Sequence, residues 1–439
     1  INTAGGNIWF YNAGGILIGS TGVINVGSLV LTANDIDTSG GLFGVGNEIR
    51  FRGASGSTST VQINAGASIT VANTNPGSAY MALVAPRIIQ RGTVSTDGST
   101  AYVAAEQADI RINQGLFDIN VLVGAEGGTV IDHSGTTTGP SANDGDPNDN
   151  RIYMVAIPKN DAVTMLVSGQ VGYQDPVTAQ VDPNGAIRLS AGYDIVSGEI
   201  AANPNPTGTG AANISVQDII FNSDIIARAS NDFVGAPVNT IYNGPPIFVP
   251  PPQQGRIRFN GSALLQGDNS ARLSIGNQQQ ILAFGGLQLV APGRAGDPGL
   301  AEINLTYNPA AAGARPGLGV TGGALQISAP GFTDPLTGNA LGGTARLNVN
   351  GGLVVATDLN ISADGTGRYL GTTNGATGTG GTAQLIVTGA GAVVQAVSIT
   401  TSATGTGDGD DFNVNAGQFV FATTGATAAG GSASVTVSG

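Results

Sequence analysis

The chain opens with Asn7-Ile-Trp-Phe-Tyr-Asn-Ala-Gly-Gly-Ile-Leu-Ile-Gly-Ser-Thr-Gly-Val-Ile-Asn-Val-Gly-Ser-Leu-Val-Leu-Thr-Ala33. Short runs of β-branched, aromatic and aliphatic residues alternate here with Gly or Asn-Ala-Gly-Gly, a pattern typical of short strands joined by tight bends. The expected strands are 8–11, 16–18, 23–26 and 29–32. Strands this short satisfy their backbone polar groups when they stack as rungs between equivalent strands of neighbouring coils. The sequence therefore predicts an all-β protein, a right-handed parallel β-helix (β-solenoid) with short strands and surface loop insertions.

The composition of the whole chain agrees with this prediction. Glycine accounts for 70 of 439 residues, and only 10% of the residues are charged. This profile differs from that of a helical or an average globular protein. Alternating runs such as Ala345–Asn350 and Gln384–Thr388 recur, and a disordered chain lacks them. We therefore expect order through most of the chain.

Charge and cysteine content exclude several kinds of partner and site. The formal net charge is −13, and Lys159 is the only lysine. An acidic chain with scattered arginines offers no basic stripe for nucleic acid and no polybasic segment for anionic lipid. The chain contains no cysteine, which excludes disulfides and a thiolate site.

Two segments carry a family resemblance. They are Phe10-Tyr-Asn-Ala-Gly-Gly-Ile-Leu-Ile-Gly19 with Val23-Ile-Asn-Val-Gly-Ser-Leu29, and Met81-Ala-Leu-Val-Ala-Pro-Arg-Ile-Ile-Gln-Arg-Gly-Thr-Val94 with Ala101-Tyr-Val-Ala-Ala-Glu-Gln-Ala-Asp-Ile110. In this order they resemble the filamentous-haemagglutinin-type secretion domain of two-partner-secretion exoproteins, in which an Asn-Pro-Asn-Gly-Ile turn precedes a Val-Gly-Gly-Leu rung. Ala13 and Gly14 stand where that turn usually has Pro and Asn, and Ser28 replaces a glycine.

The resemblance implies a secreted protein of the bacterial cell surface, exported by an outer-membrane β-barrel transporter of the two-partner-secretion type. It places Asn12, Gly14, Gly15 and Ile16 in the turn implicated in recognition by that transporter. The same residues suit a purely structural turn, because Asn and Gly adopt left-handed conformations and Ile16 can point inward. Both roles are open at this point. The resemblance further implies that a signal peptide and the first rungs precede this segment, and the chain ends within a repeat, so we expect the natural protein to be longer.

Spacing along the chain predicts three regions. Residues 1–230 form the secretion-type β-helix, 231–255 form a Pro-rich linker or arm, and 256–439 form a repetitive β-helical shaft that is truncated at its end. The middle region contains Pro245-Pro-Ile-Phe-Val-Pro-Pro-Pro-Gln-Gln254, which cannot pair in a ladder and favours polyproline II.

The shaft is defined by a repeated motif. Its copies are Gly342-Gly-Thr-Ala-Arg-Leu-Asn-Val-Asn-Gly351, Gly380-Gly-Thr-Ala-Gln-Leu-Ile-Val-Thr-Gly389 and Gly430-Gly-Ser-Ala-Ser-Val-Thr-Val-Ser-Gly439. The first two copies start 38 residues apart (380 − 342), and the last two start 50 apart (430 − 380). At an assumed ~20–25 residues per coil, each repeat is expected to form a pair of coils with variable loops between them.

Candidate catalytic groups are few. His133 is the only histidine; it is expected in a solvated surface loop, 132–150, beside Asp132, so a Ser/His/Asp triad and a His-rich metal site are disfavoured. The carboxylate pairs Asp410–Asp411 and Asp194 with Glu199 are expected to be solvated turn residues.

One segment suggests a cation site. Asp144, Asp146, Asn148 and Asn150 place oxygen atoms at alternate positions, as at the start of a calcium loop. Asp149 and Val155 then occupy the places of the required Gly and bidentate Glu, so an EF-hand is excluded. Incidental calcium binding and an Asx-rich turn both stay open.

Together these features predict a cell-surface adhesin or matrix protein that is exported by two-partner secretion, is not an enzyme and carries no cofactor. Its expected partners are the transporter and a cell-surface or matrix receptor, for which a glycan is one candidate; self-association is another. The alternative is a structural subunit of an extracellular filament or surface layer. A β-helical polysaccharide-degrading enzyme is the third hypothesis.

Overall fold

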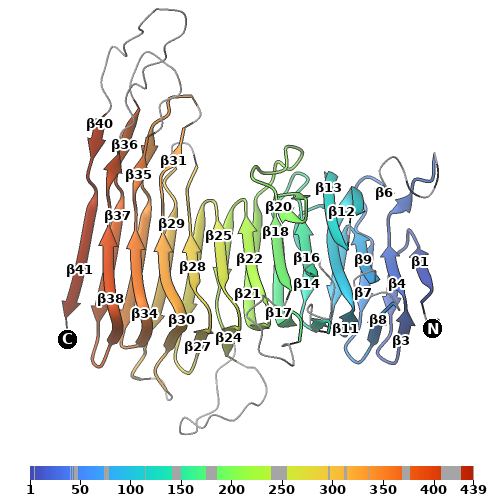
Figure 1. The fold of residues 1–439 in the computed structure, drawn as a ribbon, viewed down its shortest axis with the longest axis horizontal. Coiled ribbons are helices and arrows are strands. Elements are labelled where there is room, and N and C mark those ends of the chain that lie inside the picture. The colour runs from blue at the N-terminus through green and yellow to red at the C-terminus, as the bar shows by residue number, and fades with distance from the viewer. Residues whose placement is uncertain are drawn as a thin grey trace, which may run out of the picture. The chain divides into compact units, whose positions relative to one another are not determined.

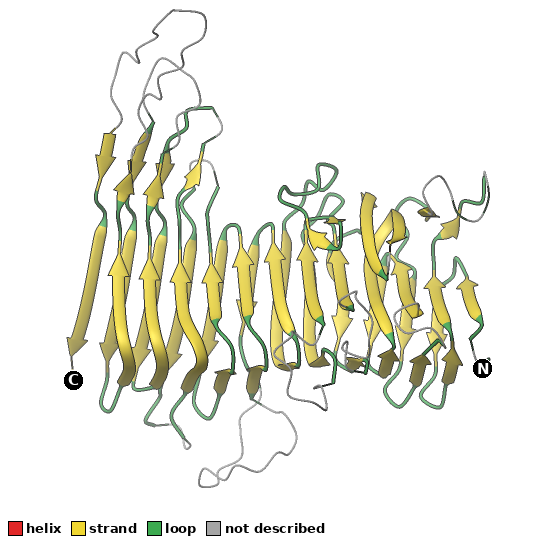
Figure 2. Ribbon diagram, viewed as in Figure 1, coloured by secondary structure: helices red, strands yellow, loops and turns green. Residues whose placement is uncertain are grey.

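The computed structural model describes residues 1–3, 5–39, 41, 43, 48–73, 79–113, 115–140, 150–174, 185–238, 255–294, 297–310, 314–334, 336–367, 376–406 and 427–438. In this part of the chain all regular secondary structure is β-strand (Figure 2). It accordingly holds no helix long and apolar enough to cross a membrane. The chain divides into two compact units, here called unit 1 (Ile1–Asn231 and Val249–Ala263) and unit 2 (Asp232–Phe248 and Leu264–Gly439).

The opening of unit 1 confirms the predicted strands to within one residue. They are β1 (Asn7–Tyr11), β2 (Ile16–Ile18), β3 (Val23–Val26) and β4 (Ser28–Thr32). β1 pairs in parallel with β4, while β2 and β3 pair in parallel with β7 and β8. Each short strand is therefore a rung, and the predicted parallel β-helix is confirmed.

Unit 1 contains three parallel ladders (Figure 1). The first consists of β1, β4, β9 (Ala79–Ala85), β12 (Gly98–Asn113), β16 (Arg151–Ala156), β18 (Ala186–Ala191) and β22 (Asp224–Ala229). The second consists of β2, β7 (Thr60–Ile63), β10 (Arg87–Gln90), β14 (Gly128–His133), β17 (Val163–Val171) and β21 (Ala212–Phe221). The third consists of β3, β8 (Ser68–Val71), β11 (Thr93–Thr96) and β15 (Thr136–Thr138), continued by the ends of β17 and β21 and by β24 (Arg256–Phe259).

A second sheet covers the outer face of the first ladder. β12 pairs in parallel with β9 and β16 up to Ala104, and beyond it runs into an antiparallel sheet. That sheet also contains β5 (Asp35–Ile36), β6 (Glu48–Arg52), β13 (Leu116–Gly124), β19 (Ile195–Val196) and β20 (Glu199–Ile200). Outward residues of the ladder, including Val30 and Val103, form one buried cluster with Phe51 and Phe117 of the covering sheet.

Unit 2 repeats the ladder arrangement without such a cover along its described strands. Its first ladder consists of β23 (Asp232–Gly235), β26 (Ser270–Ile275), β29 (Leu300–Thr306), β33 (Thr344–Asn350), β37 (Thr382–Thr388) and β41 (Ser432–Ser438). The second ladder begins with β27 (Gln280–Ala283) and continues through the first halves of β30 (Gly317–Ser328), β34 (Leu353–Ser362) and β38 (Val393–Ser402). The third ladder begins with β25 (Ala263–Gly267) and β28 (Leu287–Val290) and continues through the second halves of the same three strands. Buried and partly exposed residues alternate along β33 and β37, as expected for strands with one face in the core.

The register of these strands corrects the predicted coil length. Thr344 pairs with Thr382, and Thr382 pairs with Ser432, so each repeat of the glycine motif is one coil and not two. The estimate was too short because it took the strand segments within a repeat as separate coils, whereas β33 and β34 lie on different sides of the same coil.

Backbone crowding explains the Gly-Gly pair of the motif. A Cβ atom on Gly381 would lie 2.0 Å from the carbonyl oxygen of Gly343, and one on Gly431 would lie 2.1 Å from that of Gly381. The N–H of Gly381 instead donates a hydrogen bond to Ala363 O at 2.6 Å, and that of Gly431 donates to Ala403 O at 2.7 Å. The repeat therefore preserves a close contact between two backbone segments.

At the same corner, unit 2 carries a small additional sheet (Figure 1). It consists of β31 (Phe332–Thr333), β32 (Ala340–Leu341), β36 (Thr377–Thr379) and β40 (Thr427–Ala429), and lies near the pair β35 (Gly365–Thr366) and β39 (Gly405–Thr406). β31 and β32 form an antiparallel hairpin, whereas the other pairings are parallel.

Unit 1 includes Val249–Ala263 in addition to Ile1–Asn231, and the secretion-type and shaft regions predicted for 1–230 and 256–439 stay predictions. Of the predicted linker or arm, 231–255, residues Asp232–Gly235 form β23 and pair with β26. Its Pro-rich part, 245–254, lies outside the described residues.

Candidate functional site

The residues predicted for transporter recognition lie together in the turn between β1 and β2. The Gly14 N–H donates to Asn12 Oδ1 at 2.8 Å, and the Gly15 N–H donates to Asn12 O at 2.9 Å. Gly15 has φ of 99°, and a Cβ there would lie 2.6 Å from Thr60 O. Ile16 begins β2 and pairs with Val61. The geometry gives Asn12 and Gly15 a structural role in the turn; recognition stays a prediction.

A cavity of about 400 Å³ lies beside this turn. Asn12, Gly15 and Ile16 line it together with Phe10 and Leu17, whereas Gly14 does not. Phe10 and Leu17 are large apolar side chains on the surface. The turn therefore adjoins an apolar surface that the sequence analysis did not identify.

The prediction for His133 is wrong. The residue is fully buried at the end of β14, because the ladder continues through Asp132 and resumes in β15, where a surface loop was expected. Its Nδ1 lies 2.9 Å from Ser168 O, and its Nε2 lies 2.9 Å from Thr137 Oγ1. Since a carbonyl oxygen only accepts, Nδ1 carries the proton and the Thr137 hydroxyl donates to Nε2. Burial lowers the pKa of His133 to about 4, so the ring is neutral.

The buried histidine belongs to a chain of polar groups inside unit 1. The Tyr102 hydroxyl lies 2.8 Å from Thr137 Oγ1 and donates to it when the Thr137 proton is directed to the histidine. Burial raises the pKa of Tyr102 above its ordinary value, which keeps the phenol protonated. Asp132 is not part of this hydrogen-bonded series of side chains; its Oδ2 lies 2.9 Å from Arg91 Nη2. These groups satisfy one another and offer no exposed nucleophile or base.

Of Asp194 and Glu199, both predicted to be solvated turn residues, Glu199 is exposed at the start of β20, as predicted, whereas Asp194 is partly buried. Asp194 Oδ1 accepts hydrogen bonds from the Val121 N–H at 3.0 Å and from Asn205 Nδ2 at 2.8 Å, and burial raises the pKa of its carboxyl. Burial also acts against ionisation of Glu199, but the hydrogen bonds and charges of Arg188 and Arg151 outweigh it and lower the pKa of this carboxyl. Asp194 binds the covering sheet at Val121, and Glu199 joins that sheet to Arg188 and Arg151 of the first ladder.

A further cluster surrounds the lone lysine. Lys159 Nζ lies 3.1 Å from both carboxylate oxygens of Glu106 and 3.0 Å from Glu126 Oε1. The hydrogen bonds that Lys159 donates to Glu126 and Glu106 raise the pKa of Lys159. Glu106, only 1% exposed, sits at the bulge where β12 changes sheets and also accepts the Gly56 N–H at 2.9 Å. The cluster joins three segments around this bulge, and the single lysine was the one sequence signal for it.

The calcium prediction concerns residues of which only Asn150 is described. It is buried between β15 and β16; Asp144, Asp146 and Asn148 lie outside the described residues, as do Asp410 and Asp411. Among the described residues, no group of three or more His, Asp or Glu side chains could hold a metal ion.

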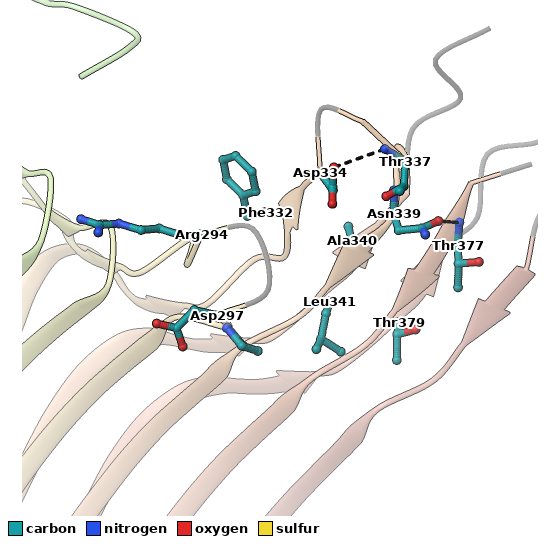
Figure 3. A pocket seen from close by; sticks show the side chains of 11 residues that line it. Arg294, Asp297, Phe332, Asp334, Thr337, Asn339, Ala340, Leu341, Thr377 and Thr379 are labelled. Carbon is teal, nitrogen blue, oxygen red and sulfur yellow. Dashed lines mark hydrogen bonds between the residues drawn. The ribbon is translucent and has the colours of Figure 1, made fainter. Parts of the chain in front are cut away.

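A larger cavity, of about 500 Å³, lies at the corner of unit 2 that carries the small sheet. We call it the step pocket; its lining residues are Arg294, Asp297, Pro298, Phe332, Asp334, Thr337, Asn339, Ala340, Leu341, Thr377 and Thr379. Figure 3 shows Arg294 and Asp297 on one side and the β31–β32 hairpin with Asp334 and Asn339 on the other. Sequence reasoning missed this pocket, because its residues come from three connections that are far apart in the chain.

Hydrogen bonds hold the polar wall of the step pocket in place. Asp334 Oδ1 accepts the N–H groups of Leu336 and Thr337 at 2.7 and 3.2 Å. Asn339 Oδ1 accepts the Thr377 N–H at 2.7 Å and so links the hairpin to β36 (Figure 3). The second carboxylate oxygen of Asp334 and the amide Nδ2 of Asn339 are left for other partners.

Comparison with known proteins adds no assignment. No protein-family model matches the chain, and no curated protein sequence matches it significantly. Its family is therefore not established, and what it does has to be inferred from its own residues.

Proposed function

We propose that the chain is part of a secreted bacterial cell-surface adhesin or matrix protein, exported by two-partner secretion and without enzymatic activity. The observation that carries this proposal is the row of polar side chains on the outer face of the unit 2 ladders. Residues that pair in register repeat a polar position from coil to coil, which suits repeated contacts with an extended surface.

Glu302, Arg346 and Gln384 illustrate these rows. They occupy equivalent positions of β29, β33 and β37. Arg346 donates to Glu302 Oε1 at 3.2 Å and to Gln384 Oε1 at 2.9 Å. The three side chains pair with one another along the ladder and stay partly exposed, whereas general acid–base catalysis needs groups that converge on one point.

The export half of the proposal rests on the resemblance of residues 10–110 and on the hydrogen-bonded opening turn. The expected partner of the chain in export is an outer-membrane β-barrel transporter. A substitution of Asn12 best distinguishes recognition by the transporter from formation of the turn. Asn12→Asp keeps the Oδ1 acceptor for the Gly14 N–H but replaces the amide by a charge.

Secretion with and without the transporter tests export. Cells that carry the whole gene should present the protein on their surface only when the transporter is expressed, as judged by electron microscopy and surface labelling. Asn12→Asp should lower the amount presented if the side chain is recognised, while an unchanged amount would leave it a structural role only. Presentation without the transporter would contradict the export proposal.

Adherence tests the other half. Beads coated with the purified chain should adhere to cells or to immobilised polysaccharide, and uncoated beads should not. Ordered fibres with a constant axial repeat, together with no adherence, would instead favour the filament or surface-layer subunit. Release of reducing sugars from the polysaccharide would favour the β-helical enzyme.

A further inference from the structure

We propose that the step pocket binds a sugar unit of a neutral glycan. The inference rests on the proposed adhesin function and names the ligand class and the site. It starts from a difference in length between neighbouring coils of unit 2.

The step pocket exists because successive connections at one corner grow longer. Between β28 and β29 the chain needs only residues 291–299, whereas between β30 and β33 it uses 329–343, and between β34 and β37 it uses 363–381. The short connection turns back at once, with reciprocal backbone hydrogen bonds of 2.8 and 3.0 Å between Arg294 and Asp297. The next connection extends as the β31–β32 hairpin, so a step is left between the two coils.

Part of the step-pocket lining is apolar and exposed. Phe332 is 41% exposed and Leu341 is 49% exposed, although both lie in strands of the small sheet. An aromatic ring fixed on a strand presents a flat apolar surface without further loss of conformational freedom. The C–H face of a pyranose ring is a partner of matching shape.

Polar groups surround this apolar wall. Asp334 and Asn339 are already oriented by backbone N–H groups, as described above, and Thr377 and Thr379 add hydroxyls from β36. The combination of one carboxylate oxygen, one amide N–H group and several hydroxyls matches the mixed donors and acceptors of sugar hydroxyls.

Charge selects among sugars. The step pocket contains Arg294 but also Asp297 and Asp334, so its formal charge is negative by one unit. An acidic sugar would meet two carboxylates, and the mixed lining favours a neutral ring. The volume of about 500 Å³ lies within the range of small-molecule sites.

Saturation-transfer NMR on the full 439-residue chain tests the inference. The neutral probes are lactose, maltose, cellobiose and diacetylchitobiose, and the acidic probes are sialyllactose and digalacturonate. At least one neutral sugar should receive saturation, and Phe332→Ala should weaken its binding about tenfold, the size expected for loss of one ring contact. Phe284→Ala is the matched control, since Phe284 is 45% exposed in the same unit but does not line the step pocket. Circular dichroism and the denaturation midpoint verify that both variants fold.

Three results would overturn the inference: no saturation of any neutral sugar, an equal loss in both variants, or preferred binding of the acidic sugars. The bead assay separates this failure from failure of the proposed function. If wild-type beads adhere and Phe332→Ala beads adhere equally well, the step pocket is not the receptor site but the adhesin proposal stands. If wild-type beads do not adhere although a neutral sugar binds, the sugar site stands and the adhesin proposal fails.

Discussion

Unit 1 and unit 2 build parallel ladders from different sequence patterns. Every residue of β4 is buried, and so are Met81–Ala85 of β9, whereas β33 and β37 alternate between buried and partly exposed residues. The difference arises from the surroundings of the outer face of the first ladder in each unit. In unit 1 the antiparallel sheet covers it, so outward positions such as Val30 and Val103 are apolar. In unit 2 the corresponding face is polar, as Glu302 shows.

The two interiors differ as well. Unit 1 encloses Gln90, Thr96, His133 and Thr137 among its apolar residues. In the described part of unit 2, the buried polar side chains are Ser270 and Ser328. Buried polar groups depend on their partners, so unit 1 is expected to be the more sensitive of the two to single changes and to acid.

The largest expected effect comes from opening the covered face. Phe51→Ala removes a fully buried ring from between the antiparallel sheet and the ladder, and should lower the free energy of unfolding of unit 1 by about 3–5 kcal/mol. Phe284→Ala in unit 2 should cost less than about 1 kcal/mol. Urea denaturation followed by the fluorescence of Trp9 and by circular dichroism measures both. Equal losses would show that the cover contributes no special stability.

Acid should distinguish the interiors next. The folded-state pKa of His133 is about 4, below its ordinary value of 6.5, so the unfolded chain binds a proton that the folded chain does not. The stability due to neutral His133 is complete above pH 6.5, falls as the pH drops, and has lost about 3 kcal/mol at pH 4. Denaturation midpoints of the wild type and His133→Gln between pH 7.5 and 4 measure this loss. A variant with the wild-type pH dependence would contradict the assignment.

The glycine pair of unit 2 should give an intermediate effect. Gly381→Ala places a Cβ 2.0 Å from Gly343 O and should cost about 1–3 kcal/mol by overpacking. Gly430→Ala, at the first glycine of a neighbouring copy, places its Cβ within 4 Å of no atom of the described residues and should be nearly neutral. Thermal melts of the two variants provide the comparison. A neutral Gly381→Ala would mean that the close backbone contact relaxes at no cost.

The smallest expected effect concerns the polar rows. Arg346→Ala breaks a partly exposed pair with Glu302 and should cost below about 1 kcal/mol. Arg188→Ala in unit 1 removes a nearly buried guanidinium from Glu199 and should cost more, about 1–3 kcal/mol. High salt should reduce the Arg346 effect more, as measured by denaturation in 1 M NaCl. A larger loss for Arg346 than for Arg188 would reverse the comparison.

Local signals predicted some features well and others poorly. The short strands of 7–33 were correct because Gly and Asn punctuation marks each bend. His133 was misassigned because Asp132 and the Gly- and Thr-rich residues that follow suggest a loop, although they form rungs of two ladders. The coil length was wrong because spacing within one chain does not reveal which strands share a side. The step pocket had no local signal at all.

The sequence by itself determined that this protein is a parallel β-helix, because alternation, glycine spacing and short strands are properties of neighbouring residues. Only the tertiary structure decided which outer face is covered, that His133 is buried and neutral, and that Arg294, Phe332 and Asn339 line one pocket. These features depend on which coils stack on one another. Stacking brings residues 35 or more positions apart, such as Arg294 and Asn339, into the lining of one pocket, and their separation in the chain gives no sign of this.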